Sequence, residues 1–103
     1  MGFYLNQEIQ PRFELGETIA TDGVFAFAAK HDIDLAPYFE RHRRGDWGML
    51  CEEDKTRNEK AVKEGNTIYS AYLIDLPGQK PVTIWLITEH DRSVTTILFP
   101  SEY

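Results

Sequence analysis

The 103-residue sequence contains a single cysteine, Cys51, so no disulfide can form within the chain. A chain without disulfides fits a reducing compartment, and a lone cysteine offers no cysteine cluster for structural zinc. No apolar run approaches the roughly 18 residues of a membrane span, and the N-terminus lacks the basic-then-apolar pattern of a secretory signal. We therefore expect a cytoplasmic protein with no membrane association.

Basic residues are also few. Eleven lysines and arginines face 17 aspartates and glutamates, and the net charge is −6. Proteins that bind nucleic acid without sequence preference usually carry a basic surface that displaces counterions from phosphates. The composition argues against such a protein, although one local basic cluster, Arg41-His42-Arg43-Arg44, stands out.

The rest of the composition is that of an ordinary folded domain. Hydrophobic residues make up 42% of the chain and charged residues 27%, and six Phe, five Tyr and two Trp supply large side chains for burial. A chain of 103 residues supports one hydrophobic core. We expect a single domain over residues 1–103, in which residues 1–11 form an irregular arm.

Three helices are predicted in the first two thirds of the chain. Thr21 or Asp22 is placed to be the N-cap of the first helix, whose nearly continuous apolar sequence predicts that it is largely buried. Glycines follow the second and third helices, at Gly45 and Gly65. The expected helices span 22–31, 34–45 and 51–64, after a short strand or extended segment at 12–17.

From residue 67 onward, apolar residues recur with a period of two, which is typical of strands. Strands are expected at 67–74, 83–89 and 93–99, and the turns between them are short enough for hairpins. A sheet of three strands needs helices on one face. The predicted fold is therefore α+β, with three N-terminal helices packed on a C-terminal antiparallel three-stranded meander and a short N-terminal strand as an option.

The last turn is rich in ionisable side chains. Glu89, His90, Asp91 and Arg92 lie between two apolar strands, where Asn-Gly or Asp-Gly would close a hairpin with less loss of hydration. We interpret this turn as the first candidate site. We also expect Arg92 to bridge to Asp46 or Glu89 in a partly buried charge-assisted network.

His42 and the basic cluster form the second candidate site. On a helix, His42 shares a stripe with Leu35, Tyr38 and Phe39, which predicts either a hydrogen-bonded histidine at the core edge or a catalytic one. The neighbouring arginines, Arg41 among them, would either bind phosphate or complement the helix dipole.

Several polar residues around the third helix have two interpretations each. In the glycine-bracketed turn before it, Trp47 is expected to cover one end of the core, and Asp46 either caps the helix or holds a neighbouring arginine. Helical projection turns Asp54 and Asn58 toward the core or the rim of a cleft, where they bond to neighbouring groups or line a site. Cys51 is expected to pack in the core and not to act as a nucleophile.

A longer pattern resembles a known family. It comprises Arg41-His42-Arg43-Arg44-Gly45-Asp46-Trp47-Gly48, Asn58, Gly65, Ser70-Ala71-Tyr72, Trp85-Leu86-Ile87-Thr88-Glu89, Asp91-Arg92-Ser93, Thr95-Thr96 and Pro100-Ser101-Glu102-Tyr103. Over roughly residues 12–103, the chain is similar to small bacterial proteins commonly labelled plasmid-related or type I restriction-modification subunits. The resemblance implies an association with mobile elements. It does not imply methylation or helicase activity, because the seven glycines form neither a G-x-G cofactor turn nor a P-loop.

The order of elements also resembles, more weakly, the fold group that includes barnase, EndoU and RelE-like toxins. That resemblance implies metal-independent RNA cleavage, which needs a base, an acid and a cation for the pentavalent phosphate. His42 or Glu89 would be the base and His90 or His42 the acid. The candidate site residues are His42, Glu89, His90 and Arg92 for catalysis and Arg41, Asp46, Trp47, Asn58, Thr95 and Thr96 for binding.

Two functions follow as hypotheses. The first is a small metal-independent ribonuclease-like or RNA-binding domain whose cleft lies between the second helix and the last hairpin. The second is a non-catalytic module that binds a protein partner, such as an element-encoded regulator, or that inhibits host defence. The expected partner is thus RNA or a protein, and neither a metal ion nor a cofactor is expected. Consecutive acidic and histidine side chains on extended backbone point apart, which does not suit a metal site.

Overall fold

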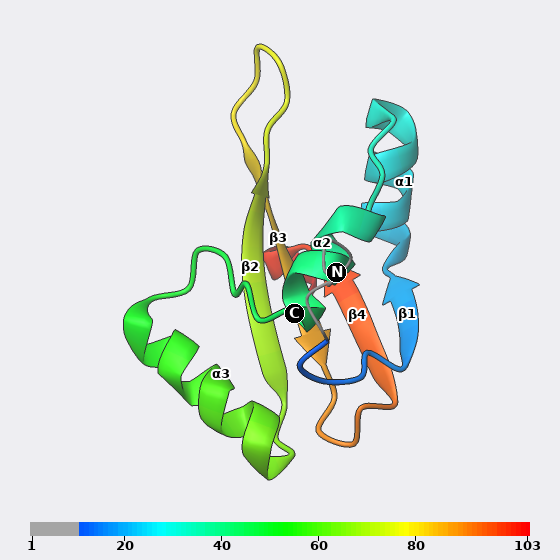
Figure 1. The fold of residues 1–103 in the computed structure, drawn as a ribbon. Helices are drawn as coiled ribbons and strands as arrows, with labels where there is room; N and C mark the ends of the chain where they lie inside the picture. The colour runs from blue at the N-terminus through cyan, green and yellow to red at the C-terminus, as the bar shows by residue number, and fades with distance from the viewer. Residues whose placement is uncertain (1–10) are drawn as a thin grey trace, which may run out of the picture.

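A computed structural model describes residues 11–103 (Figure 1). The chain folds as an α+β domain with three helices and one four-stranded mixed sheet. The elements are β1 (Glu17–Ala20), α1 (Asp22–His31), α2 (Ala36–Arg43), α3 (Glu52–Glu64), β2 (Ile68–Ile74), β3 (Val82–Thr88), β4 (Val94–Leu98) and the 3₁₀ turn η2 (Pro100–Glu102). Within residues 11–103, no helix has the length and apolar sequence needed to cross a membrane. The arm predicted for residues 1–11 lies outside the described residues except for its last one.

The sheet corrects the predicted strand arrangement. Strands β2, β3 and β4 form the antiparallel meander that was predicted, but β1 adds to β4 in parallel, with Glu17 opposite Val94. The strand order is β1-β4-β3-β2, so the sheet is mixed and a strand precedes the helices. The N-terminal strand also lies later than the extended segment predicted at 12–17. Pairing between segments so far apart in sequence leaves no local pattern from which it could be predicted.

Local signals account for the helix ends. The Thr21 hydroxyl oxygen accepts a hydrogen bond from the Val24 amide at 3.2 Å, which begins α1 where the N-cap was predicted. Gly65 ends α3 with φ of +74°, a left-handed conformation that costs glycine little. Helix α2 is shorter than predicted because Pro37 lies in its first turn and Asp34 stays outside, accepting a hydrogen bond from the Ala36 amide.

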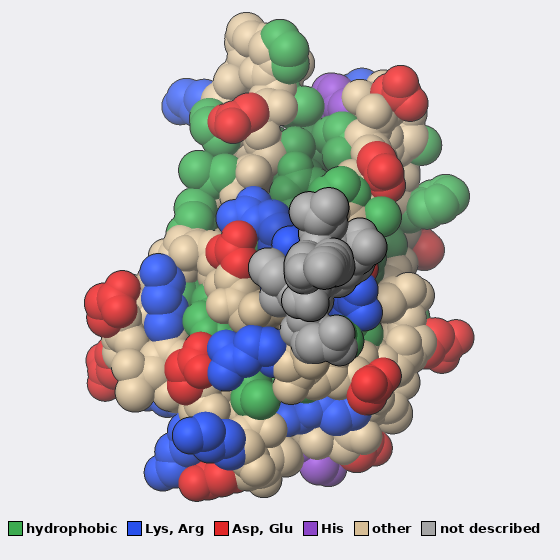
Figure 2. Space-filling view, in the orientation of Figure 1, with side chains coloured by type: hydrophobic (Ala, Val, Ile, Leu, Met, Phe, Trp, Pro, Cys, Tyr) green, Lys and Arg blue, Asp and Glu red, His purple; other side chains and the backbone are tan. Residues whose placement is uncertain are grey.

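The core lies between one face of the sheet and the helices α1 and α2. Its fully buried members include Val24 of α1, Tyr72 and Ile74 of β2, and Leu86 of β3. Figure 2 shows that hydrophobic side chains reach the surface between α1 and the β2–β3 hairpin, while charged side chains gather around the lower half of this view. Some apolar residues of α1 and of the β2–β3 hairpin are therefore exposed and not part of the core.

Helix α1 is less buried than its apolar sequence predicts. Only Val24 and Ala28 are buried in this helix, and Phe25 is 68% exposed. The helix contacts β1 and β4 at one edge of the sheet, so one stripe is covered and the remainder faces outward. The expectation that α1 is largely buried was wrong.

Helix α3 covers the free edge of β2 and does not lie on a sheet face (Figure 1). The Asn58 side chain donates to the Tyr69 carbonyl at 2.6 Å and accepts from the Tyr69 amide at 3.2 Å. Next along the edge, Ala71 pairs with the Gly48 turn. Asn58, which is 3% exposed, thus replaces a neighbouring strand and protects the edge from pairing with another chain.

The second face of the sheet is only partly covered. Residues 69, 71 and 73 of β2 alternate with the core residues and share this face with Trp85, which pairs opposite Ala71. Tyr103, which follows η2, packs its ring edge-on against Trp85 with centroids 5.5 Å apart. Ile19, Tyr69 and Leu73 remain exposed on this face. Exposed apolar side chains gathered on one face are a feature of binding surfaces.

Candidate functional site

The predicted site residues are spread over the domain. His42 and Thr95 are inside the domain, Arg41 and Asp46 are on the outer side of α2 and the turn after it, and the ionisable turn lies at the β3–β4 connection. The structure does not gather them in one cleft.

His42 lies at the centre of a buried polar chain. Its Nδ1 atom is 2.6 Å from the Ser70 hydroxyl, and its Nε2 atom is 2.9 Å from the Thr88 hydroxyl. The Thr88 hydroxyl is 2.6 Å from that of Thr95, which donates to the carbonyl oxygen of Leu15 at 2.7 Å. The chain joins α2 to three strands and to the segment before β1.

The directions of these hydrogen bonds assign the histidine tautomer. Since the Leu15 carbonyl can only accept, the single Thr95 proton is committed to it, and Thr88 must donate to Thr95. Thr88 must then accept from His42 Nε2–H, which leaves Nδ1 to accept the Ser70 proton. In the neutral imidazole the proton is therefore on Nε2, and Nδ1 accepts from Ser70.

Burial of the ring accounts for its acid–base state. His42 is 0% exposed, and the rings of Phe13 and Trp47 pack edge-on against it. Loss of hydration disfavours the imidazolium and lowers the pKa of His42 to about 3. Of the two interpretations of His42, the hydrogen-bonded core histidine describes its position. Catalysis on an external substrate would require the domain to open around it.

The ionisable turn is exposed, and Arg92 has a different role from the one predicted. Its guanidinium donates to the backbone carbonyls of Ala61 at 3.0 Å and Asn66 at 2.7 Å, and also to those of Glu89 and His90. The expected bridge to the carboxylate of Asp46 or Glu89 is therefore wrong. Arg92 connects the β3–β4 turn to the C-terminal end of α3, where the negative end of the helix dipole attracts a cation.

Thr95 and Thr96, the two candidate binding residues of β4, point to opposite faces of the sheet. Thr95 is buried in the His42 chain, whereas Thr96 is opposite Ile87 on the second face. Glu89 and His90 are exposed in the turn, outside the His42 chain. The structure therefore does not bring the predicted acid, base and phosphate contacts together.

Two of the three arginines of the basic cluster, Arg41 and Arg43, are paired with acids. Asp46 accepts from Arg41 Nε at 2.7 Å, as one of the two interpretations of Asp46 predicted, and the Arg41 guanidinium lies over the Tyr72 ring. A depression of about 280 Å³ lies here, lined by Arg41, Arg44, Gly45 and Asp46. Arg43 pairs with Glu40 in the same way. This pairing reduces the positive potential that a phosphate backbone requires.

Trp47 covers one end of the core, as predicted, and is 4% exposed. Its indole N–H donates to the Glu59 carboxylate at 3.0 Å, and Arg12 donates to the same carboxylate. The hydrogen bond from Arg12, followed by that from Trp47, lowers the pKa of Glu59 to about 2. Cys51, in contrast, is exposed just before α3, so the prediction of core packing was wrong.

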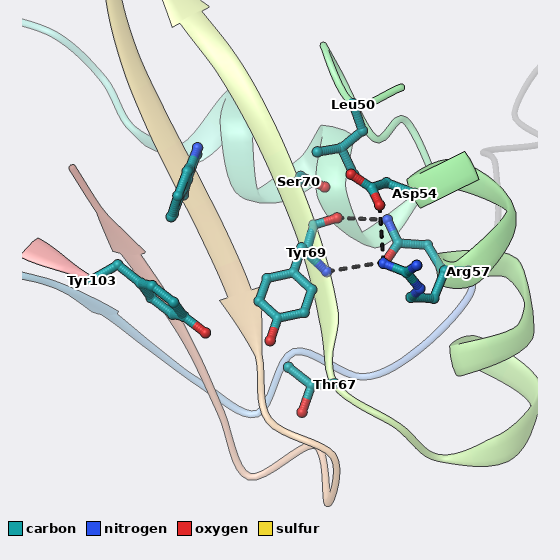
Figure 3. A pocket seen from close by; sticks show the side chains of 9 residues that line it. Leu50, Asp54, Arg57, Thr67, Tyr69, Ser70 and Tyr103 are labelled. Carbon is teal, nitrogen blue, oxygen red and sulfur yellow. Dashed lines mark hydrogen bonds and ion pairs between the residues drawn. The ribbon is translucent and has the colours of Figure 1, made fainter. Parts of the chain in front are cut away.

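A second cavity of about 280 Å³ lies between α3 and the second face of the sheet. We call it the aromatic pocket. Its lining residues are Leu50, Asp54, Arg57, Asn58, Thr67, Tyr69, Ser70, Trp85 and Tyr103. Three aromatic rings from β2, β3 and the segment after η2 are set against polar side chains of α3. Figure 3 shows Tyr69 between Tyr103 and the α3 side chains.

The polar side of the aromatic pocket contains one ion pair. Arg57 donates to Asp54 at 3.0 Å, and both side chains are partly exposed. The hydrogen bond with Tyr103 is the main cause that raises the pKa of Tyr69, followed by burial, and the nearby Glu89 carboxylate adds to the shift. Asp54 supplies the carboxylate among the lining residues. Among residues 11–103, no three His, Cys, Asp or Glu side chains are grouped to hold a metal ion.

Sequence reasoning found only part of this pocket. Helical projection predicted that Asp54 and Asn58 point toward the core or the rim of a cleft. In the structure both line the aromatic pocket, and Asn58 also covers the β2 edge. Tyr69, Trp85 and Tyr103 were not predicted to act together. One signal was present, because aromatic residues occur at both alternate positions of β2, at 69 and 72, which indicates that both faces of the sheet carry large side chains.

Comparisons with known proteins identify no relative. No protein-family model, no curated protein and no solved structure matches the chain significantly.

Proposed function

We propose that this protein is a non-catalytic module that binds a protein partner through the aromatic pocket. The observation that carries the proposal is the grouping of Tyr69, Trp85 and Tyr103 in a cavity on the partly covered sheet face. Tyrosine and tryptophan are the residues that most often anchor protein interfaces, since they combine large apolar area with a polar tip.

The size of the pocket supports a side-chain anchor. Pockets for drug-sized ligands usually span about 300–1,000 Å³, and this cavity, at about 280 Å³, lies just below that range. One protruding side chain of a partner fits such a volume, and the surrounding sheet face, with Leu73 and Ile19 exposed, would extend the contact. A central anchor with a less critical periphery is the usual anatomy of an interface.

The arrangement of the other candidates favours binding over RNA cleavage. His42 is enclosed, Glu89 and His90 lie outside its hydrogen-bond chain, and Arg41 is neutralised by Asp46. General acid–base catalysis needs both groups within hydrogen-bond reach of one substrate. The resemblance to plasmid-related proteins points to a partner encoded by the same mobile element or by the host defences it encounters.

Affinity capture from a bacterial host tests this function. The wild-type protein, Tyr103→Ala and Phe25→Ala are compared, and protein and RNA are quantified in each eluate. Phe25 is a matched control because it is a similarly exposed aromatic residue outside the pocket, 68% against 73% for Tyr103. A protein partner should be retained by the wild type and Phe25→Ala and lost with Tyr103→Ala. Recovery of no partner, or equal recovery with all three proteins, would contradict the proposal.

Incubation with structured and single-stranded RNA in the presence of EDTA tests the competing function directly. We expect no cleavage. Metal-independent cleavage that disappears in His42→Ala, while that variant stays folded, would establish the ribonuclease instead.

A further inference from the structure

We infer that the aromatic pocket receives a cationic side chain, an arginine or lysine, from a basic segment of the protein partner. The inference deepens the proposed binding function and depends on it. Two features of the pocket indicate this class of ligand: its aromatic rings and its charge.

Three aromatic rings line the pocket and can attract a cation. The Trp85 and Tyr103 rings are inclined at 71° with centroids 5.5 Å apart, so they form two walls and not one flat stack. Tyr69 supplies a third ring from the neighbouring strand (Figure 3). Because a cation over the face of a Trp or Tyr ring is attracted by the electron-rich face, each of these lining rings can attract a guanidinium or ammonium group.

The charge around the pocket selects the same ligand. Asp54 lines the cavity, and the contact from Arg57 is to its Oδ1 atom, which leaves Oδ2 to accept a hydrogen bond from a ligand. The one lining cation, Arg57, is already paired with Asp54 at 3.0 Å. The whole chain carries a net charge of −6, which attracts a basic partner over longer distances.

The same charge disfavours a nucleotide. A base would stack on the tyrosines, but its phosphates would approach the Asp54 carboxylate, and Arg57 would have to leave that carboxylate to neutralise them. A neutral apolar side chain would fill the volume without using the Asp54 carboxylate. The cation is therefore the ligand that uses both halves of the pocket.

The test is an NMR titration of the full chain with N-acetyl-arginine amide. N-acetyl-citrulline amide, which has nearly the same shape without the charge, is the control, and uridine monophosphate represents the nucleotide class. The arginine compound should shift the Trp85 indole and Tyr69 signals while leaving those of Trp47, which is buried elsewhere, in place. It should bind at least about threefold more tightly than the citrulline compound, which is a typical cation–π contribution.

Two matched pairs of variants connect the binding to the pocket. Tyr103→Ala should weaken binding of the arginine compound at least about threefold, whereas Phe25→Ala should leave it unchanged. Asp54→Asn should also weaken it, because the released Arg57 charge would then face the ligand. Glu52→Gln, which removes an exposed carboxylate from the same helix turn but outside the pocket lining, should not.

Each contrary outcome identifies what has failed. Equal binding of the arginine and citrulline compounds, or stronger binding of the nucleotide, overturns the cation assignment. If the arginine compound causes no shifts while affinity capture still depends on Tyr103, the pocket binds a protein through another side chain, and only this inference fails. If neither experiment depends on Tyr103, the proposed function fails as well.

Discussion

Lowering the pH from 7 to 5 should destabilise this protein mainly through His42. The folded domain holds this imidazole neutral, because burial lowers its pKa to about 3 from an ordinary value of 6.5. The unfolded chain therefore binds a proton that the folded chain excludes. The stabilising contribution is complete above pH 6.5 and is lost as the pH falls toward 3.

The magnitude follows from the two pKa values. At pH 5 the unfolded histidine is almost fully protonated while folded His42 is almost fully neutral. The linkage relation then gives a loss of about 2 kcal/mol in the free energy of unfolding between pH 7 and pH 5. Glu59, with a pKa of about 2 in place of 4.5, acts in the same direction but chiefly below pH 4.5, so it contributes little in this interval.

Denaturant unfolding at pH 7, 6 and 5 measures the effect in wild type, His42→Gln and His90→Gln. His42→Gln should be less stable than wild type at pH 7, because it breaks the hydrogen-bond chain from Ser70 to Thr95, but its stability should change by about 2 kcal/mol less over the interval. His90→Gln, in the exposed turn, should keep the wild-type pH dependence. If His42→Gln is too unstable to measure, the imidazole signals of wild-type His42 should stay at their neutral positions down to pH 5.

The reasoning is refuted if wild type and His42→Gln lose the same stability between pH 7 and 5. It is equally refuted if the His42 imidazole titrates near 6.5 in the folded protein. Either result would mean that the ring is hydrated and that the buried hydrogen bonds connecting it to Ser70, Thr88 and Thr95 are not formed as described.

Three further substitutions test the scaffold by denaturant unfolding. Asn58→Ala should lower the free energy of unfolding by about 2–4 kcal/mol, because two backbone groups at the β2 edge lose their partners; a loss below about 1 kcal/mol would mean that water replaces the amide. Arg92→Ala should lower the free energy of unfolding by about 2 kcal/mol or more, whereas Arg57→Ala, which removes an exposed ion pair, should lower it by less than about 1 kcal/mol. Equal losses would contradict the role of Arg92 in connecting the turn to α3. Gly48→Ala should lower the free energy of unfolding several times more than Gly78→Ala. Both glycines have φ above +70°, but only at Gly48 would a Cβ lie 1.9 Å from a carbonyl oxygen of β2. Similar losses for the two variants would show that backbone conformation, and not the close contact, determines the effect.

Features set by neighbouring residues could be predicted from the sequence. Thr21 and Gly65 mark helix ends through capping, which depends on four or five consecutive residues. The three C-terminal strands follow from alternation and short turns. The inward stripe of α2, including His42, follows from helical periodicity.

Features that depend on contacts between residues far apart in the sequence could not be predicted. The parallel contact of β1 with β4 joins residues 17–20 to residues 94–97, and it turns a meander into a mixed sheet. The exposure of Phe25 depends on which side of α1 the sheet occupies, and the composition of the helix does not reveal that side. The partners of Arg92 are backbone carbonyls, whose positions no residue type indicates.

The candidate site also combines features that could be predicted from the sequence with features that could not. Helical periodicity alone predicted that Asn58 points toward the core or the rim of a cleft, and Asn58 lines the aromatic pocket. The ring of Trp85 meets Tyr103 only because η2 brings the segment after β4 across the second face of the sheet. The aromatic pocket is therefore a product of tertiary structure, although each of its aromatic residues is visible in the sequence.

Site-specific photo-crosslinking tests the central claim most directly. The photoreactive residue p-benzoylphenylalanine replaces Tyr103 in one variant and Phe25 in another, and both proteins are irradiated in a bacterial host. The account predicts a discrete adduct from position 103 and none from position 25, with the crosslink mapped by mass spectrometry to an arginine- or lysine-bearing segment of one protein. The absence of a protein adduct from position 103, the same adducts from both positions, or an adduct with RNA would contradict it.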